Sequence, residues 1–544
     1  MADAYDVVVL GTGASGLTAA LAAASAGASV GLFEKADRIG GTTALSGGVV
    51  WLPDNGRAGE DVTDSRDLAL AYLDSLSNGS MRPEMTAAFV DGVRPTLRWL
   101  DDETPLRLRP VPGYPDYHPE HPGGLPGGGR SMEPELFGTD VLGAWRDRIE
   151  GAPRRLYIGE IPSGGGTGVI APELMRRRTA AAQEGLGRGL VAALLKGCLE
   201  RGIEPVTGAR ATGLLTGGGA SGGMSEAGPV RVSGVRFETA AGHREVRAGA
   251  AVFIATGGFE HDPELVRDFI RGPVAHPPGA AANTGDGLRL AMSAGARLGA
   301  MGEAWWVPVV LVPGTDGTAA PVLLLRERTL PGTLMVNGRG DRFTNEAANY
   351  NALGAAFHAF DVTEFRYANL PAWLVLDDAC VRKYGVFGTT PGSAAPEWLT
   401  SDATLDGLAG RIGVPAGRLS ATVARFNAGA AAGHDPDCRR GESVYDGWCG
   451  DRAHYGTPQA TLGPLTTGPF HAVPVHPSTL GTKGGPRTTP DGQVVRADGM
   501  LVDGLYAAGN AMAAATGMAY GGAGGTLGPA MVFARRAGLH AAQS

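Results

Sequence analysis

The chain has 544 residues, of which 43% are hydrophobic and 19% are charged, and it is long enough for two or more domains that share a large core. Its net charge of −8 argues against nucleic acid as a partner and against a basic membrane-binding face. Because no run of about eighteen apolar residues occurs, we expect no transmembrane segment and a cytoplasmic protein, with at most a peripheral contact to a membrane.

The first predicted elements surround a glycine-rich turn. The apolar run 5–10 before it is typical of a strand buried on both faces, and the run 17–26 after it, rich in Ala and Leu, is typical of a helix. Gly11 permits the tight turn, Gly13 lets the backbone approach a pyrophosphate, and Gly16 allows the helix to pack closely on the strand. The sequence thus predicts a dinucleotide site that includes Gly11, Gly13, Ala14, Ser15 and Gly16.

A second predicted strand and a second glycine-rich loop extend this site. The strand, residues 29–33, ends at Glu34, about twenty residues after the turn, where a carboxylate accepts hydrogen bonds from ribose hydroxyls. The loop at 40–48 follows, with backbone N–H groups and hydroxyls that can wrap the rest of a large cofactor. Since an NAD enzyme has no evident need for this loop, the sequence favours a flavin. The expected contacts are Glu34, Lys35, Gly41, Thr42, Thr43, Ser46, Gly47 and Gly48.

Regular structure then gives way to a loop rich in Pro and Gly. Apolar residues at helical spacing predict helices between 64 and 101. Residues 110–124 are expected to be irregular, because Pro removes backbone donors and Gly widens the accessible backbone. The loop carries Tyr114 and Tyr117, and long loops of this kind are often functional. A rigid surface loop with two half-buried rings would have the same composition.

Strands that return to the nucleotide are expected in the next part of the chain. The apolar run 251–255 ends in small residues, which suits a backbone close to a nucleotide, although close packing alone also explains such an ending. The cofactor contacts expected here are Ala209, Thr256 and Gly257. Residues 283–286 either face the cofactor or cap a helix. The Gly- and Ser-rich segment 217–228 is predicted to be a hairpin tip.

The composition changes near residue 306, where aromatic and amide residues replace Ala and Gly. We interpret 306–478 as an inserted catalytic or substrate domain, between the first part of the nucleotide-binding domain, 1–305, and its C-terminal part, 479–544. Trp305 and Trp306 suit the wall of an apolar pocket, although Trp is ordinarily a core residue. No metal is expected, because Cys and His lack the spacing of a metal site.

The end of the chain is predicted to return to the cofactor. Residues 499–510 form a turn and a buried strand that ends in Gly-Asn. After a loop that contains Tyr520, a final helix begins near Gly528, and its N-terminal amides would favour the anionic reduced state of a flavin. The expected contacts are Gly509, Asn510, Thr526 and Leu527.

With these pieces, the chain resembles the flavoproteins of the fumarate reductase and succinate dehydrogenase superfamily, and more narrowly the 3-ketosteroid Δ1-dehydrogenases. The resemblance spans nearly the whole chain. The narrower likeness rests on Tyr117, on Asn345-Glu346 with Tyr350, and on the segments 481–485 and 520–528. It implies an α/β fold, in which a Rossmann-type FAD-binding domain carries an inserted α+β substrate and catalytic domain.

The family resemblance also implies an activity, the FAD-dependent oxidation of the C1–C2 bond of a 3-ketosteroid. The Tyr520 hydroxyl and the Gly524 backbone N–H would stabilise the carbonyl oxygen as it becomes enolate-like. Tyr350 would take the C2 proton, and Tyr117 would donate a hydrogen bond to Tyr350, with Tyr114 as the alternative assisting residue. The hydride from C1 would pass to the flavin. A quinone or another small acceptor would reoxidise the flavin.

One departure from the superfamily bears on how the cofactor is held. Covalent members attach the flavin to a His in the loop that here reads Thr42-Thr43-Ala44-Leu45, so we expect non-covalent FAD.

Three other functions remain open. The first is a Δ4-dehydrogenase of 5α-steroids or a desaturase of a smaller cyclic ketone. The second is a fumarate-type reductase, which segment 345–350 disfavours because it offers amide and phenol groups where a dianion needs cations. The third is a non-enzymatic flavin-binding module.

Overall fold

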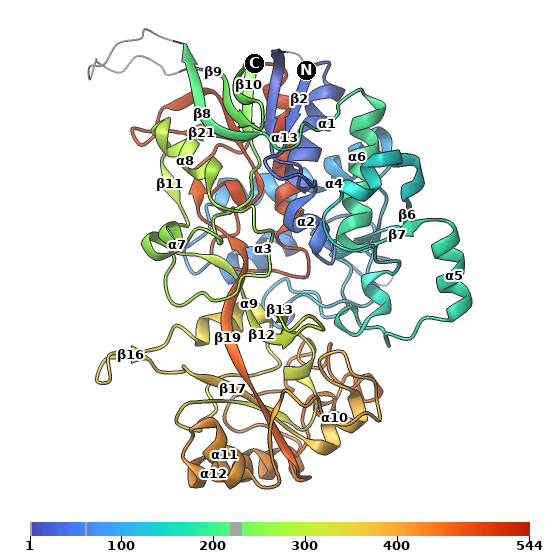
Figure 1. The fold of residues 1–544 in the computed structure, drawn as a ribbon, viewed down its shortest axis with the longest axis vertical. Coiled ribbons are helices and arrows are strands. Elements are labelled where there is room, and N and C mark those ends of the chain that lie inside the picture. The colour runs from blue at the N-terminus through green and yellow to red at the C-terminus, as the bar shows by residue number, and fades with distance from the viewer. Residues whose placement is uncertain (1–2, 60–61, 218–230) are drawn as a thin grey trace.

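In the computed structural model, which describes residues 3–59, 62–217 and 231–544, the first residues of the chain form an inner strand of a seven-stranded sheet, next to its edge. β1 (Ala4–Leu10) pairs in parallel with β2 (Val30–Phe33) and with β10 (Gly242–Ile254). β10 pairs in parallel with β22 (Leu501–Ala507), so the end of the chain returns to the sheet beside its beginning (Figure 1). The sheet is completed by β8 (Arg210–Gly217), β9 (Arg231–Thr239) and β21 (Gln493–Val495). Beyond residue 217, the predicted hairpin tip at 217–228 lies outside the described residues.

Helices cover this sheet because its central strands are apolar on both faces. α1 (Ala14–Ser25) begins directly at the glycine-rich turn and packs against α13 (Leu527–Ala541) and α6 (Leu186–Glu200). Gly538 permits this close approach, because a Cβ there would lie 2.6 Å from the Ala19 carbonyl oxygen. The helices predicted between 64 and 101 are α3 (Arg66–Ser77) and α4 (Pro83–Glu103).

A six-stranded sheet forms the core of the lower part of the molecule (Figure 1). β12 (Ala304–Pro313) and β19 (Phe470–Thr482) are antiparallel neighbours in it, and β19 runs from the upper part of the molecule into the lower part. The predicted limits of the inserted domain, 306 and 478, fall within these two strands, and the division into domains stays a prediction. The other strands are β13 (Ala319–Leu323), β14 (Thr333–Asn337), β17 (Ala372–Asp377) and β18 (Thr400–Asp402).

Shorter elements connect and cover the two sheets. The remaining helices are α2 (Gly41–Leu45), α5 (Pro172–Ala180), α7 (Pro263–Phe269), α8 (Asp286–Ser293), α9 (Tyr350–Ala356), α10 (Asp378–Tyr384), α11 (Leu405–Ile412) and α12 (Ala416–Ala431). The short strands are β3 (Val50–Trp51), β4 (Leu108–Pro110), β5 (Ser131–Pro134), β6 (Phe137–Gly138), β7 (Gln183–Glu184), β11 (Leu298–Gly299), β15 (Phe360–Asp361), β16 (Arg366–Tyr367) and β20 (Gly485–Pro486). The 3-10 helices are η1 (Thr139–Arg148), η2 (Ile158–Glu160), η3 (Pro162–Gly164), η4 (Glu327–Thr329), η5 (Arg452–His454), η6 (Pro458–Ala460) and η7 (Gly509–Ala511). In the part of the chain that the structure describes, no helix has both the length and the apolar character needed to span a membrane.

Candidate active site

A continuous cavity of about 710 Å³ connects the glycine-rich turn with the predicted catalytic tyrosines. All predicted cofactor positions except Gly16 and Gly509 line it, and so do Tyr117, Tyr350, Tyr520 and Gly524. Gly16 serves packing instead, because a Cβ there would lie 1.9 Å from the Gly11 carbonyl oxygen. A Cβ on Gly509 would likewise lie 2.2 Å from the Ser15 hydroxyl.

The cavity fits a dinucleotide at its first end. The Gly13 cap of α1 has no side chain and the Ala14 amide donates to the Thr43 hydroxyl, so the amides that follow Ala14 in the first turn are the ones that can meet a phosphate. Gly11 adopts φ +105°, and a Cβ there would meet the Ala255 carbonyl oxygen at 2.3 Å, so the turn requires glycine. The Thr256 hydroxyl lines the same cavity, is buried, and has no hydrogen-bond partner among the described residues.

Glu34 is fixed at the end of β2 by the turn itself. One carboxylate oxygen accepts hydrogen bonds from the Thr12 backbone N–H at 3.1 Å and from the Thr12 hydroxyl at 2.7 Å. The other accepts from the Ala36 N–H at 3.0 Å. The second glycine-rich loop joins the same turn, since the Ala14 N–H donates to the Thr43 hydroxyl at 3.1 Å. The two loops therefore form one wall.

Lys35 binds the segment 283–286, for which the sequence left two roles open. Its ammonium donates to Asp286 and to the Thr284 hydroxyl, each at 2.7 Å, and Arg210 also donates to Asp286, at 2.8 Å. Burial alone would raise the pKa of Asp286, but the hydrogen bonds from Arg210 and Lys35 lower it. Asp286 lines the cavity, so the segment that opens α8 belongs to the cofactor wall.

Tyrosines from three distant segments meet at the second end of the cavity. The Tyr117 hydroxyl donates to the Tyr350 hydroxyl at 3.0 Å, and the two rings meet edge to face with centroids 5.5 Å apart. The Tyr520 ring lies 5.2 Å from that of Tyr117 and 5.5 Å from that of Tyr350. Tyr114 lies on the same wall, where its ring packs against Trp448 at 4.7 Å. Of the two candidate assisting residues, Tyr117 is thus the one whose hydroxyl donates a hydrogen bond to Tyr350.

Burial dominates the ionisation of these phenols. Desolvation raises the pKa of Tyr117, Tyr350 and Tyr520 above the ordinary value for tyrosine. For Tyr350, the neighbouring Tyr520 raises the pKa further, whereas the hydrogen bond from Tyr117 lowers it. All three groups are therefore neutral hydrogen-bond donors at neutral pH.

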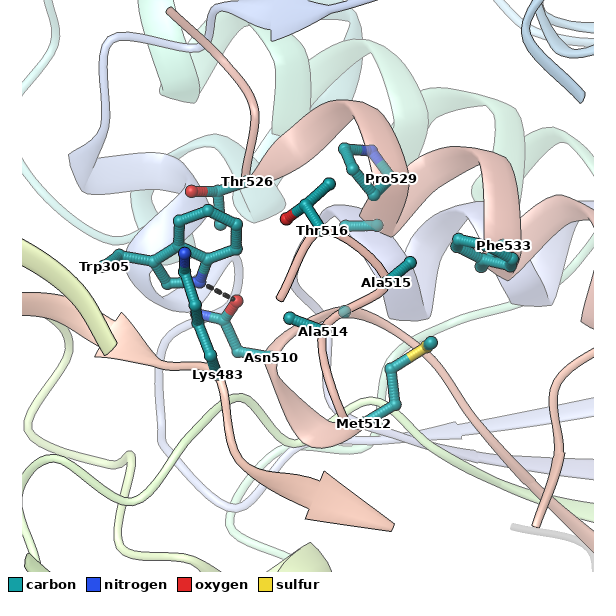
Figure 2. A pocket seen from close by; sticks show the side chains of 12 residues that line it. Trp305, Lys483, Asn510, Met512, Ala514, Ala515, Thr516, Thr526, Pro529 and Phe533 are labelled. Atoms are coloured by element: carbon teal, nitrogen blue, oxygen red, sulfur yellow. Dashed lines mark hydrogen bonds between the residues drawn. The ribbon is translucent and has the colours of Figure 1, made fainter. Parts of the chain in front are cut away.

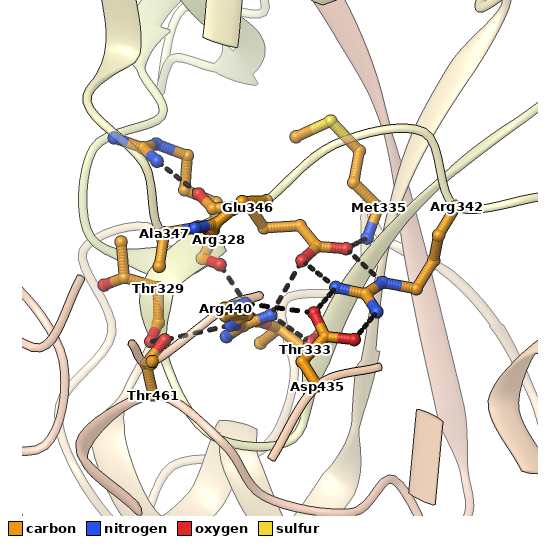
Figure 3. Close-up of polar contacts among 12 residues, drawn as sticks. Arg328, Thr329, Thr333, Met335, Arg342, Glu346, Ala347, Asp435, Arg440 and Thr461 are labelled. Carbon is orange, nitrogen blue, oxygen red and sulfur yellow. Dashed lines mark hydrogen bonds and ion pairs between the residues drawn. The ribbon is translucent and has the colours of Figure 1, made fainter. Parts of the chain in front are cut away.

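The segment before Tyr350 is held by a buried ion network (Figure 3). Arg342 binds Glu346 at 2.7 Å and Asp435 at 2.8 Å, and Arg440 binds Glu346 at 3.3 Å. Arg328 donates to the backbone carbonyls of Glu346 and Ala348. Glu346, part of the motif that carried the family resemblance, does not line the cavity. Its charge anchors the segment.

Asn349 completes the placement of Tyr350 at the start of α9. Its side-chain oxygen caps the helix by accepting the Ala352 N–H at 2.9 Å. Its amide nitrogen lies 3.0 Å from the His118 ring and 3.5 Å from the Tyr117 carbonyl oxygen. The cap therefore also joins Tyr350 to the loop of Tyr117.

The Gly-rich loop that carries Tyr520 is fixed through its backbone carbonyls. Asn351 donates to the Met518 carbonyl at 3.3 Å, Tyr72 to that of Gly521 at 2.7 Å, and Ser131 to that of Ala523 at 3.0 Å. The Tyr117 backbone N–H also donates to the Gly521 carbonyl, at 3.0 Å. The Thr526 hydroxyl lies 3.2 Å from the Tyr520 hydroxyl, to which it donates.

The prediction that two adjacent tryptophans line an apolar pocket is only partly right. Successive residues of a strand point to opposite faces. Trp305 packs on Tyr520 with ring centroids 4.9 Å apart, whereas Trp306 packs on His358, at 4.4 Å, in a separate core cluster. Neither ring lines the large cavity, although Trp305 lines a smaller one beside it.

Other cavity walls escaped the sequence analysis. Apart from Val49, which directly follows the second glycine-rich loop, they come from segments far from those loops, so no local pattern marks them. The apolar ones near the tyrosines are Val49, Ile158, Leu323, Leu325 and Leu480.

Comparisons with known proteins agree with this geometry. The family described as FAD binding domain matches residues 6–527. A 4-oxocyclohexanecarboxylate 2-dehydrogenase of Sinomonas cyclohexanicum is 40% identical over 98% of this chain and 92% of its own length. A 3-oxosteroid 1-dehydrogenase of Mycobacterium tuberculosis is 38% identical over 99% of this chain and 98% of its own. The crystal structure of the 3-ketosteroid Δ1-dehydrogenase of Sterolibacterium denitrificans, in complex with 1,4-androstadiene-3,17-dione, is 33% identical, with a TM-score of 0.88 over 100% of both chains.

These findings confirm the predicted fold class and FAD as the cofactor. The chain therefore belongs to the FAD binding domain family, as an FAD-dependent oxidoreductase of the group that includes the 3-ketosteroid Δ1-dehydrogenases.

Proposed function

We propose that the protein catalyses the FAD-dependent 1,2-dehydrogenation of 3-ketosteroids. The observation that carries this proposal is the meeting of Tyr117, Tyr350 and Tyr520 at the far end of the cofactor cavity. A ketone there would have its oxygen beside Tyr520 and Gly524 and its adjacent C–H bonds near Tyr350. Relatives named as 3-oxosteroid 1-dehydrogenases support the same reaction.

Each tyrosine has a defined task in this proposal. The Tyr520 hydroxyl and the Gly524 N–H donate to the ketone oxygen, which makes the neighbouring C2–H bond more acidic. Tyr350, in its phenolate form, takes the C2 proton, and Tyr117 donates a hydrogen bond that stabilises that phenolate. The electron pair left at C2 forms the C1–C2 double bond as the hydride leaves C1. FAD, when bound, supplies the acceptor for that hydride.

The walls near the tyrosines favour a steroid over a small ionised ketone. Val49, Ile158, Leu323, Leu325 and Leu480 are apolar, as the rings of a steroid require. Among the residues that the structure describes, the cations that line the cavity are Lys35 and Arg38, and they lie with Glu34 on the nucleotide side. A carboxylate buried beside the tyrosines would therefore lack a charged partner, and that costs free energy.

A 4-oxocyclohexanecarboxylate-type ketone is the second candidate substrate, because a relative named for that activity is 40% identical. Both candidates share the chemistry at the ketone and differ in what surrounds the rest of the ring. A fumarate-type reduction has less support, since a dianion would need cations where this cavity has phenols.

The test is anaerobic bleaching of the flavin absorbance in the purified FAD-bound protein. We expect rapid bleaching with 4-androstene-3,17-dione and slow or no bleaching with 4-oxocyclohexanecarboxylate. Faster bleaching by the carboxylate would transfer the proposal to the second candidate. Oxidation of the reduced protein by fumarate, without bleaching by either ketone, would overturn both.

We also propose that a small acceptor such as a quinone reoxidises the flavin in turnover. Mixing the bleached protein anaerobically with a soluble quinone should restore the oxidised flavin spectrum. A spectrum that stays bleached would exclude that quinone as the acceptor.

A further inference from the structure

A buried lysine, Lys483, lies beside Trp305 at a small cavity next to the site (Figure 2). Lys483 follows β19, and its side chain is 0% exposed. It borders a small cavity of about 20 Å³, and the side chains of Met512, Pro529 and Phe533 line other parts of that cavity. A cation in such surroundings loses most of its hydration, so its remaining contacts decide where it sits.

Two contacts that the Lys483 ammonium makes with described residues lead to Tyr520. It donates a hydrogen bond to the Ala519 carbonyl oxygen at 2.9 Å, and Ala519 is the residue before Tyr520. It also lies 4.1 Å from the centroid of the Trp305 ring. That ring packs edge to face on Tyr520, at 4.9 Å, and its N–H donates to Asn510 at 2.9 Å.

The charge sets Lys483 apart from the other anchors of this loop. Asn351, Tyr72 and Ser131 hold the neighbouring carbonyls with neutral donors. A hydrogen bond from an ionised donor is stronger than one from a neutral donor, by roughly a factor of two. In its protonated form, which predominates below its pKa, Lys483 thus supplies a charged anchor at the carbonyl next to the phenol.

The charged groups around Lys483 partly balance one another. Burial lowers the pKa of Lys483 to about 7, while Glu303 raises it and Arg271 lowers it further. Glu303 and Arg271 form their own ion pair at 2.9 Å. Glu260 is the buried carboxyl near the preceding residue, Thr482, and burial raises its pKa to about 7. None of these groups takes the two contacts that join Lys483 to Tyr520.

We propose that Lys483 is a positioning residue for Tyr520, which it holds through the Ala519 carbonyl and the Trp305 ring. The functional part of this inference rests on the role proposed above for Tyr520 as donor to the ketone oxygen. Loss of the ammonium leaves the cofactor and the base in place and misdirects the phenol.

The first test measures the position of the phenol without turnover. 3-Fluorotyrosine is incorporated at position 520 of the FAD-bound protein, and its fluorine resonance is compared in the parent, in Lys483→Met and in Lys383→Met. Lys383 is the matched control, because its ammonium also lies over a tyrosine ring, 4.9 Å from that of Tyr384, and binds Asp451, but it is surface-exposed. We expect the resonance to shift and broaden in Lys483→Met alone.

The second test is a double-mutant cycle on the reaction. Lys483→Met should keep its FAD and lower the rate of flavin reduction roughly ten- to a hundredfold, the range expected for a hydrogen bond from a charged donor. In a Tyr520→Phe background the same substitution should have little further effect, because its target hydroxyl is gone. Lys483→Gln, which keeps an N–H donor without the charge, serves in both tests if the Met variant does not fold.

The outcomes separate this inference from the proposed function. A fluorine resonance that is unchanged in Lys483→Met, or a rate loss of the same size with and without the Tyr520 hydroxyl, overturns the inference. If the resonance shifts but no ketone reduces the flavin, Lys483 still positions Tyr520 and the proposed function fails.

Discussion

Residue-scale chemistry in this protein depends on phenols that are buried together. Tyr117 and Tyr350 share a hydrogen bond of 3.0 Å, and desolvation raises the pKa of both. A buried neutral phenol is a good donor and a poor base. The same environment therefore suits Tyr520, which in the proposal donates a hydrogen bond to the ketone oxygen. Tyr350, the proposed base, must first lose its own proton.

The first prediction separates proton removal from hydride transfer. Tyr350→Phe has no group to accept the C2 proton, so exchange of the C2 hydrogens of a 3-ketosteroid with solvent should stop. Tyr520→Phe removes one of two donors to the ketone oxygen and should slow exchange and flavin reduction on the order of 10²–10³-fold. Proton NMR in D₂O measures the exchange. Exchange at the parent rate in Tyr350→Phe would move the base elsewhere, with Tyr117 the next candidate.

The second prediction concerns pH. Because burial raises the pKa of Tyr350, the phenolate is a minor form at neutral pH, and its population grows as pH rises toward that pKa. In Lys483→Met, which has no lysine ammonium that loses its proton in this range, the rate of flavin reduction should therefore increase from pH 6 to pH 9, by at most about tenfold per pH unit. Stopped-flow traces across this range, with Tyr520→Phe as a control that keeps the slope, measure it. A rate that falls with rising pH would contradict the assignment of Tyr350 as the base.

At the scale of elements, the site is assembled from ends of strands and starts of helices. β1 and β2 deliver the turn and Glu34, while α9 begins at Tyr350. The order of strand, glycines, helix, strand and acid is local, so the sequence predicted this half of the site. The contact of Lys35 with Asp286 spans 251 residues, and no spacing rule could have shown it. Tyr117 was separated from Tyr114 in the same way, by contact with a helix far along the chain.

The third prediction concerns the buried anchor of α9. Glu346→Gln removes the charge that Arg342 and Arg440 share. Arg342 keeps its ion pair with Asp435, but the buried Arg440 loses the ion pair that it makes with Glu346, which should lower the free energy of unfolding by roughly 3–5 kcal/mol. Urea unfolding measures this loss, and Glu364→Gln, at an exposed position, is the control. Equal stability of the two variants would show that the network does not hold the segment of Tyr350.

At the scale of the whole molecule, one cavity joins two parts that the sequence divides. The predicted limits near 306 and 478 fall within β12 and β19, which continue from one part into the other. The change in composition marked where the second sheet begins. It did not show that Leu323, the last residue of β13, and Leu325 after it would line the cavity. Such walls depend on how the sheets pack, which a local pattern does not encode.

The fourth prediction concerns the attachment of the cofactor. Thr42, Thr43 and Leu45 of α2 line the cavity and α2 contains no His, so acid precipitation should release all the flavin as free FAD. Gly13→Leu should lower FAD occupancy before it lowers stability, because the new side chain blocks the approach to the pyrophosphate. Flavin absorbance of the supernatant and of the redissolved pellet measures both the release of FAD and its occupancy, and thermal unfolding measures the stability of Gly13→Leu. Flavin that remains in the pellet would contradict non-covalent binding.

The central claim is that these tyrosines direct oxidation to the C1–C2 bond of a 3-ketosteroid. The most direct test uses a 5α-saturated 3-ketosteroid, in which the C1–C2 and C4–C5 bonds are both available. NMR of the product after anaerobic conversion by the FAD-bound protein identifies the new double bond. We predict that the double bond forms first between C1 and C2. A first product with a C4–C5 double bond would contradict the claim. So would a protein that oxidises 4-oxocyclohexanecarboxylate and leaves the steroid unconverted.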